Sequence, residues 1–158
     1  MAELTHFDNN GNAHMVDISE KQISFRIAKA ACSVHMSLET LKIISDGSAK
    51  KGDVLSVARI AGIQGAKRTS ELIPLCHPIS LTKVNLDLIL NEKLPGIEII
   101  ATAKTTGPTG VEMEALTAAG VSALTVYDMV KSLDKSLIIK NLRLILKDGG
   151  KSGRYESS

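Results

Sequence analysis

The chain has few aromatic residues and few cysteines. It contains no Trp, two Phe and two Tyr among 158 residues, although 44% of its residues are hydrophobic, so its core must be aliphatic. Cys32 and Cys76 form no Cys-x-x-Cys pair, which excludes a zinc ribbon and a disulfide scaffold. No apolar run approaches a membrane span, and no basic stretch precedes an apolar one near the N-terminus. These absences predict a cytoplasmic protein without a membrane segment.

The charge of the chain and its histidine content exclude further classes of protein. Charged residues make up 23% of the chain and the net charge is +2, without a basic stripe interleaved with aromatic residues. We therefore expect no nucleic-acid partner. The histidines and cysteines show no metal-ligand spacing, so we predict no metal site and no cofactor. The histidines are His6, His14, His35 and His77.

The length bounds the organisation of the chain. A chain of 158 residues is long enough for one domain and too short for two ordinary ones, so residues 1–158 are predicted to form a single domain. Residues 1–12 are polar and carry a turn signal, Asp-Asn-Asn-Gly, at 8–11. This segment is expected to be mobile.

Hydrophobic spacing predicts an α+β fold. The predicted elements, in chain order, are a strand at 23–36 whose phase changes midway, a short helix from the N-cap Ser37 to Gly47, a helix at 53–72, strands at 84–90 and 97–103 joined by a hairpin loop, a helix at 110–133, and a strand at 142–146. This order is the split β-α-β repeat of a ferredoxin-like domain, with a doubled first crossover. Helices are expected to cover one face of the antiparallel sheet and to leave the other free to pack on another subunit.

Small residues recur on the helix predicted at 53–72. Ala58, Gly62 and Ala66 stand four apart and would allow a close helix approach. A glycine inside a helix costs about 0.5–1 kcal/mol relative to alanine, so Gly62 and Gly65 require a packing reason. That packing lies either within one chain or between subunits.

The strongest chemical signal lies in the helix predicted at 110–133. A glycine turn at 106–110 opens this helix, and free N–H groups at a helix N-terminus form a ready anion site. Asp128 and Lys131 stand three apart and therefore share one helix face. They act either on one ligand or as a surface ion pair. The combination points to chemistry on a phosphorylated small molecule.

The segment at 72–78 carries the second signal, because Pro74 and Pro78 restrict the backbone around Cys76 and His77. A histidine held in this way suits proton transfer near neutral pH or a hydrogen bond to phosphate or base. A Cys-His nucleophilic pair is a weaker interpretation, since neighbours in an extended segment point to opposite sides. We therefore favour a structural thiol at Cys76, and leave His77 open between function and structure.

Two glutamates open the predicted helix. Thr109 and Glu112 match the capping box, in which each side chain satisfies a backbone donor near the other. Glu114 lies about 200° around the helix from Glu112, so the two are not expected to face one site. Glu114, together with the neighbouring Met113 backbone, is the one expected to face the pocket.

Two further lysines are candidates for phosphate contacts. Lys51 precedes the helix predicted at 53–72 and either reaches an anion at that helix dipole or is solvated. Lys151 lies in a glycine-rich segment at 148–153 that resembles a P-loop only superficially. The first glycine of that motif would fall at Ile145, inside a predicted strand, and no helix follows. A flexible glycine backbone with Lys151 can still hold phosphate as a nest.

Several motifs, in order along the chain, carry a resemblance to a known family. They lie at 4–6 (Leu-Thr-His), 14–17 (His-Met-Val-Asp), 61–69 (Ala-Gly-Ile-Gln-Gly-Ala-Lys-Arg-Thr), 72–78 (Leu-Ile-Pro-Leu-Cys-His-Pro), 109–118 (Thr-Gly-Val-Glu-Met-Glu-Ala-Leu-Thr-Ala), 127–131 (Tyr-Asp-Met-x-Lys) and 149–153 (Gly-Gly-Lys-Ser-Gly). Together they closely resemble the cyclic pyranopterin monophosphate synthases, the MoaC family of molybdenum cofactor biosynthesis. The resemblance spans about 4–153, nearly the whole chain.

This resemblance implies a substrate, an assembly and a set of residues. The substrate would be a dihydro-GTP whose ribose C3′ is bonded to guanine C8, made by a radical S-adenosylmethionine GTP cyclase. The product would be cyclic pyranopterin monophosphate, formed with loss of pyrophosphate in a homohexamer, a trimer of dimers with sites at subunit boundaries. Matching residues imply Asp128 as catalytic acid/base, assisted by Lys51 and Lys131. The substrate-binding set would comprise Leu75, Cys76, His77, Met113, Glu114, Glu112 and Lys151.

Two positions depart from the family pattern, and two rival functions stay open. Pro108 stands where a basic residue is common, and Arg154 where an acid often follows the glycine loop, so the charge at both points differs. The rivals are a non-catalytic nucleotide-binding or assembly module that uses the same lysines for affinity, and a cysteine hydrolase at Cys76. Turnover of the cyclised nucleotide with pyrophosphate release separates the three.

Overall fold

A computed structural model describes residues 4–157 and places five strands in one antiparallel sheet of order β2-β3-β1-β4-β5. The elements are β1 (Ser24–His35), α1 (Leu38–Ser45), α2 (Val54–Lys67), α3 (Thr69–Leu72), β2 (Leu81–Asn91), β3 (Gly96–Gly107), α4 (Glu112–Val130), β4 (Ile138–Asp148) and β5 (Tyr155–Glu156). The first four strands follow the ferredoxin-like order, which confirms the predicted α+β fold.

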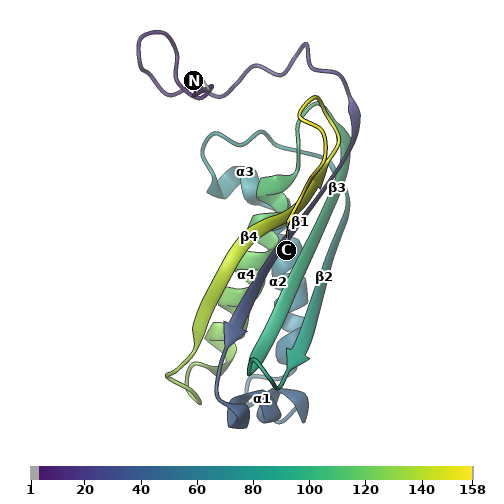
Figure 1. Ribbon diagram of the computed structural model, residues 1–158. Helices are drawn as coiled ribbons and strands as arrows, with labels where there is room; N and C mark the ends of the chain where they lie inside the picture. Colours follow the sequence, from purple (N-terminus) through teal and green to yellow (C-terminus); the bar gives the residue numbers. More distant parts are fainter. Residues whose placement is uncertain (1–3, 158) are drawn as a thin grey trace.

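The helices α2 and α4 lie side by side over one face of the sheet (Figure 1). Alternate residues of β1 face them, and Ala28, Ala30 and Val34 are fully buried there. The short helix α1 closes one end of the molecule, while α3 lies toward the other end (Figure 1). The aliphatic core predicted from the composition is therefore a single layer between the two helices and the sheet.

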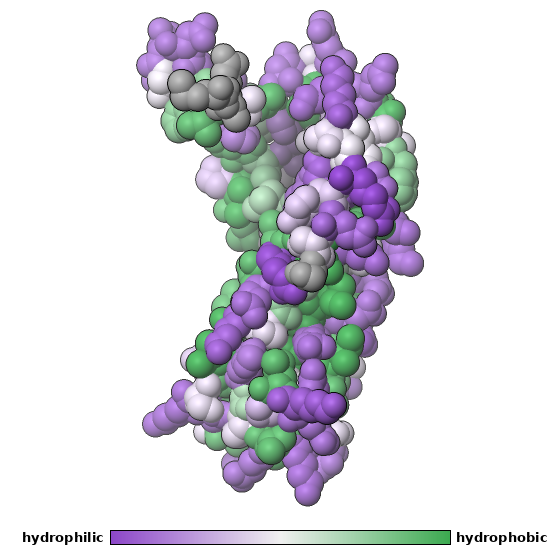
Figure 2. Space-filling model, in the orientation of Figure 1, coloured by the Kyte–Doolittle hydropathy of each residue, from purple (hydrophilic) through white to green (hydrophobic). Residues whose placement is uncertain are grey.

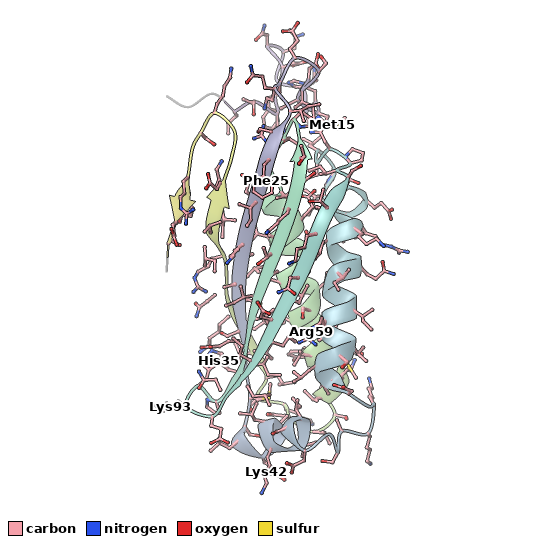
Figure 3. The ribbon with its side chains drawn as sticks, turned by 90° about the vertical axis from the view of Figure 1, so that its right-hand side faces the viewer. Met15, Phe25, His35, Lys42, Arg59 and Lys93 are labelled. Carbon is pink, nitrogen blue, oxygen red and sulfur yellow. The ribbon has the colours of Figure 1, made fainter. Side chains whose placement is uncertain are left out.

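The helices α1 and α2 both begin with a side-chain cap, of which the one from Ser37 was predicted. The Ser37 side chain accepts a hydrogen bond from the Thr40 backbone N–H at α1, and Asp53 accepts from Ser56 at α2. In addition, Arg59 of α2 donates from Nε to the carbonyl of Leu86 at 3.1 Å, which ties this helix to the edge strand β2 (Figure 3).

The prediction of one helix at 53–72 is wrong in one respect, because the helix breaks at Arg68 into α2 and α3. The Thr69 hydroxyl donates to the carbonyls of Gly65 and Ala66, at 3.3 and 2.9 Å, in the last turn of α2. A side chain that bonds these carbonyls competes with continuation of the backbone ladder. The chain therefore turns toward the segment at 72–78 earlier than the apolar spacing indicates.

The phase change predicted inside the first strand is wrong, because the even-numbered residues from Ala28 to Val34 face the helices without interruption. The pairing of β1 with β4 shifts register between Lys29 and Ala30 and again between Ala31 and Ser33, whereas its pairing with β3 is continuous. The extra residues at both shifts belong to β4, so they do not change which residues of β1 face the helices. The strand β5 was not predicted; its two residues pair with the end of β4.

The small residues of α2 pack within the chain. A Cβ at Gly62 would stand 2.9 Å from the carbonyl oxygen of Ala118 in α4 and 3.0 Å from Leu86. A Cβ at Gly65 would meet Val121 of α4 at 2.9 Å. Of the two alternatives left open by the sequence, same-chain packing therefore accounts for both glycines.

The face of the sheet opposite the helices is uncovered and mixed in character. Alternation along the strands places exposed Phe25 and Ile89 on this face together with Lys29 and Lys104. Viewed from the sheet side, hydrophobic and hydrophilic residues are interleaved (Figure 2). Between residues 4 and 157, no helix is both long and apolar enough to cross a membrane.

Gly62→Ala is expected to lower the free energy of unfolding by about 1–3 kcal/mol, because its Cβ would be forced against a backbone oxygen that cannot move aside. The control is Gly120→Ala in α4, where the nearest atom to a new Cβ is 3.5 Å away, and which should gain up to about 1 kcal/mol from helix propensity. Urea unfolding of both variants checks this contrast; a Gly62→Ala variant as stable as Gly120→Ala would contradict it.

Candidate functional site

A cavity of about 170 Å³ lies at the N-terminal end of α4. It is lined by His6, Leu75, Cys76, His77, Ile79, Thr109, Gly110, Glu112, Met113 and Glu114. The sequence-predicted substrate-binding residues from 75–77 and 112–114 therefore share one wall, and only Lys151 of that set is not part of it. A helix N-terminus, a rigid loop and an N-terminal segment meet here from distant parts of the chain.

The loop between α3 and β2 shapes one side of the cavity. Its turn is closed by a hydrogen bond from the Cys76 backbone N–H to the Ile73 carbonyl at 3.1 Å, and the Ser80 carbonyl accepts from the Thr105 hydroxyl of β3 at 2.6 Å. The Cys76 thiol is half-buried, and its burial, followed by the nearby Glu114 carboxylate, raises its pKa. Since the thiolate is the nucleophilic form, this environment favours the structural thiol.

His77 is engaged with the backbone of the N-terminal segment. Its Nε2 lies 2.6 Å from the Val16 carbonyl oxygen. A carbonyl can only accept a hydrogen bond, so Nε2 must carry the proton and donate it. In the neutral imidazole, Nδ1 is then the basic nitrogen.

The capping box predicted for α4 is wrong. The N-cap is Val111, without a side-chain hydrogen bond, and Thr109 lies outside the helix. The Glu112 carboxylate is instead 3.3 Å from the Lys147 ammonium of β4, with both side chains only about a quarter to a third exposed (24% and 30%). A long-range ion pair thus replaces the local cap, which leaves backbone N–H groups at this helix end uncapped by side chains.

The expectation that only one glutamate faces the pocket is also wrong, because both Glu112 and Glu114 line it. The cavity lies beyond the end of α4, so side chains from opposite sides of its first turn can reach it. Glu114 is 3% exposed, and its burial, with a smaller contribution from the Glu112 charge, raises its pKa to about 7. Glu114 can therefore donate or accept a proton near neutral pH.

Two basic residues that the sequence did not single out hold this end of the molecule together. Arg26 of β1 donates from Nε and Nη2 to the carbonyls of Gly107 and Pro108, at 3.1 and 3.2 Å. Lys147 contacts Glu112 and also donates to the Ser152 hydroxyl. Lys147 stands immediately before the glycine segment, and this position was the only sequence signal for it.

The glycine segment packs against β1. Gly149 has φ +100°, and a Cβ there would overlap the Phe25 carbonyl, so only glycine fits. Lys151 is exposed and does not line the cavity; the contact between Ser152 and Lys147 is what brings its loop near the site. Arg154, at the position that departs from the family pattern, is paired with Asp148 and Glu156 at 3.3 and 2.8 Å.

Asp128, Lys51 and Lys131 form a second cluster, the lysine–aspartate cluster. The Asp128 carboxylate lies 2.7 Å from the Lys131 ammonium and 3.4 Å from that of Lys51. Hydrogen bonds from Lys131 and then Lys51 lower the pKa of Asp128, and the Asp128 carboxylate raises the pKa of Lys131. The cluster therefore presents two cations around one carboxylate, and all three side chains are at least half exposed.

Lys51 reaches this cluster from the connection between α1 and α2. The turn that carries it is closed by a hydrogen bond from the Gly52 N–H to the Ala49 carbonyl, and Lys51 also donates to the Asp128 backbone carbonyl at 3.1 Å. Although Lys51 stands two residues before the N-cap of α2, its ammonium caps the negative end of α4.

The cavity and the lysine–aspartate cluster lie at opposite ends of α4. Glu114 and Asp128 are separated by about 21 Å along the helix axis, at a rise of about 1.5 Å per residue. Figure 1 shows the same separation, with α3 near the cavity end and α1 near the other. Proton transfer requires contact at about 2.6–3.2 Å, so within one chain the two groups cannot act on the same reacting atoms.

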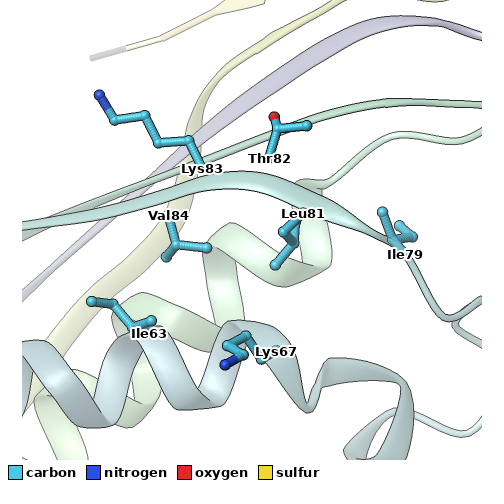
Figure 4. A pocket seen from close by; sticks show the side chains of 7 residues that line it. All are labelled: Ile63, Lys67, Ile79, Leu81, Thr82, Lys83 and Val84. Atoms are coloured by element: carbon cyan, nitrogen blue, oxygen red, sulfur yellow. The ribbon is translucent and has the colours of Figure 1, made fainter.

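A second cavity, of about 360 Å³, opens between α2 and β2 and shares Ile79 with the first. Leu81 and Val84 point toward Ile63 and Lys67 of α2, whereas Thr82 and Lys83 point to the other side of the strand (Figure 4). Its walls are mainly aliphatic and offer no acid.

Over residues 4–157 no group of three or more His, Cys, Asp or Glu side chains is arranged to hold a metal ion.

The structure is an α+β fold with a cavity lined by two glutamates at one end of α4 and the lysine–aspartate cluster at the other. Residues 15–150 match the MoaC family, and the chain belongs to that family, the cyclic pyranopterin monophosphate synthases of molybdenum cofactor biosynthesis. It is an enzyme family, so the enzyme class expected from the motifs is confirmed.

The similarity extends over full-length relatives. A cyclic pyranopterin monophosphate synthase of Jannaschia sp. (strain CCS1) is 60% identical over 99% of this chain and 96% of its own length. One from Cereibacter sphaeroides (strain ATCC 17029 / ATH 2.4.9) is 60% identical over 100% of this chain and 99% of its own. One from Methylobacterium nodulans is 56% identical over 99% of this chain and 98% of its own.

The raised pKa of Glu114 predicts a pH dependence of stability. Folding favours the protonated carboxyl, so its stabilisation is complete below the ordinary value of 4.5 and is lost as the pH rises through about 7. Relative to Glu114→Gln, the wild type should lose stability between these pH values and run parallel outside them. Urea midpoints between pH 4 and 8 measure this, with exposed Glu39→Gln as the control. Parallel curves for the wild type and Glu114→Gln would contradict the shift.

Proposed function

We propose that two copies of this chain build one active site, in which the 3′,8-cyclised dihydro-GTP is converted into cyclic pyranopterin monophosphate with release of pyrophosphate. One copy contributes the cavity at the N-terminal end of its α4. The other contributes the lysine–aspartate cluster, Lys51, Asp128 and Lys131, from the C-terminal end of its own α4. The observation that carries this proposal is the separation of the two groups in a single chain.

The surface around the cluster supports contact with a partner subunit. Leu124 is 61% exposed and Tyr127 37%, although both lie within one turn of Asp128 on α4. Large apolar side chains beside an exposed charged group are expected where a second protein surface will cover them. Such cover would also remove water from the cluster and strengthen its electrostatic effect on a substrate.

The chemistry of the cavity suits the ring system of the substrate. Glu112 pairs with the Lys147 ammonium at 3.3 Å, whereas burial raises the pKa of Glu114 to about 7. The N–H groups of a guanine-derived ring are donors that a carboxylate accepts, as Glu and Asp accept from base amino groups elsewhere. Opening and reclosing the ring requires proton transfers, and Glu114 and the basic Nδ1 of His77 can provide and receive those protons.

The lysine–aspartate cluster suits the phosphate chemistry. A sugar hydroxyl attacks the α-phosphorus, the bond from that phosphorus to the oxygen bridging to the β-phosphate breaks, and pyrophosphate leaves. The Asp128 carboxylate takes the hydroxyl proton, and the Lys51 and Lys131 ammonium groups stabilise the negative charge that develops on the phosphate oxygens. No metal ion or cofactor is required for these steps, so none is proposed.

The wider setting is proposed from the family. Six chains would assemble as a trimer of dimers in the cytoplasm, and a radical S-adenosylmethionine GTP cyclase would supply the cyclised nucleotide. The substrate-binding set would comprise Leu75, Cys76, His77, Glu112, Met113 and Glu114 of the cavity together with Lys151, whose loop lies beside Lys147. A binding module without catalysis uses the same lysines only for affinity, and the kinetic test below separates it from the enzyme.

Lys131→Ala and Lys51→Ala are each expected to lower kcat by roughly 10²–10⁴ while the cyclised nucleotide still binds, because these groups act on charge that develops during reaction. Pyrophosphate release in single turnovers and equilibrium binding measure the two effects. Exposed Lys135→Ala is the matched control and should behave as the wild type. A rise in KM with unchanged single-turnover rates would instead favour the binding module.

Subunit mixing tests the shared site. Glu114→Ala and Asp128→Ala are each expected to be inactive, but a mixed dimer would contain one site with both lesions and one intact site. After full exchange at equal amounts, half of the dimers are mixed, so activity should return to about one quarter of wild type. Each variant taken alone through the same exchange is the control. If the mixture stays as inactive as its components, both groups act within one chain.

A further inference from the structure

A histidine outside the assigned substrate-binding set lies at the cavity. His6 belongs to residues 4–16, here called the N-terminal arm, which projects beyond the ends of the strands (Figure 1). Met15, near the C-terminal end of the arm, lies close to those ends of the strands that are farthest from α1 (Figure 3). Although the arm is mostly exposed, His6 lines the same cavity as Glu112, Glu114 and His77. The cavity wall therefore contains two histidines, from different segments.

The backbone of the arm around His6 is internally organised. The Asp8 carboxylate accepts from the backbone N–H groups of Asn10 and Asn12 at 2.9 and 2.8 Å, and Phe7 pairs with Ala13 as an isolated bridge. The His6 carbonyl accepts from the His14 N–H at 2.9 Å. These bonds hold residues 6–14, here called the finger of the arm, in one backbone conformation before any ligand binds. The entropy lost when the His6 ring makes a contact is therefore smaller.

The arm is attached to the cavity through His77. The hydrogen bond from His77 Nε2 to the Val16 carbonyl, at 2.6 Å, joins the base of the finger to the loop between α3 and β2. This bond occupies Nε2 of His77. Within residues 4–157 no comparable bond engages the His6 ring, whose two nitrogens are therefore both available to a ligand.

We propose that His6 is a substrate-contacting residue that binds the polar edge of the ring system in the cavity, and that His77 is also a positioning residue that holds the arm in place. This inference rests on the proposed function, since it concerns the substrate of the same site. An imidazole can donate or accept a hydrogen bond near neutral pH, which suits a ring that carries both kinds of group.

His6→Ala is expected to raise the Kd of the cyclised nucleotide about tenfold, the effect of one lost hydrogen bond to a polar ligand, and to raise KM more than it lowers kcat. His6→Gln should recover part of the binding, because an amide also donates and accepts. The matched control is His14→Ala on the same finger, which does not line the cavity and should bind as the wild type.

Hydrogen exchange tests the positioning role. In His77→Ala the amides of Asn10, Asn12 and His14 should exchange faster than in the wild type, and His77→Gln should restore part of their protection, because its amide can donate to the Val16 carbonyl. His6→Ala should leave these amides unchanged, which separates loss of a contact from loss of the arm.

The possible failures are distinguishable. If the wild type neither binds nor turns over the cyclised nucleotide, the proposed function is wrong. If the wild type is active but His6→Ala binds as well as His14→Ala, or His6→Gln recovers nothing, the contact is wrong. If exchange in the arm is unaffected by His77→Ala, the positioning role is wrong.

Discussion

The straight run of α4 is the constraint on which the site depends. Its 19 residues carry the acids of the cavity at one end and Asp128 at the other, and a helix cannot bring its own ends together. Gly62 and Gly65 allow α2 to pack closely against α4. The proposal that a second copy of the chain completes the site rests on this separation of the two ends of α4.

The two ends of α4 differ in how the surroundings of their ionisable side chains favour catalysis. At the cavity, burial already acts within one chain, since it raises the pKa of Glu114 to about 7 and also raises the pKa of the Cys76 thiol. At the other end the ion pairs of Asp128 are exposed, and ion pairs in water add little to stability. Their arrangement is therefore better explained by function than by folding, and covering them with a partner would complete the preparation of the site.

Local patterns in the sequence predicted most of the fold, because alternation and helix caps are local. Ser37 caps its helix as expected, and the strands predicted at 84–90 and 97–103 lie within β2 and β3. The errors arose where a distant group competes with a local one. Glu112 fits a capping box with Thr109, but Lys147 from β4 attracts its carboxylate; the approach of Lys51 to Asp128 was implied by family resemblance and had no local signal.

The most direct test of the account is a crystal structure of the Lys131→Ala variant with the cyclised nucleotide bound, since the variant should bind the substrate without consuming it. The account predicts one nucleotide between two subunits, with its ring system against Glu114 and His77 of one copy and its phosphates near Lys51 and Asp128 of the other. A nucleotide whose ring and phosphates are contacted by a single chain would contradict the shared site.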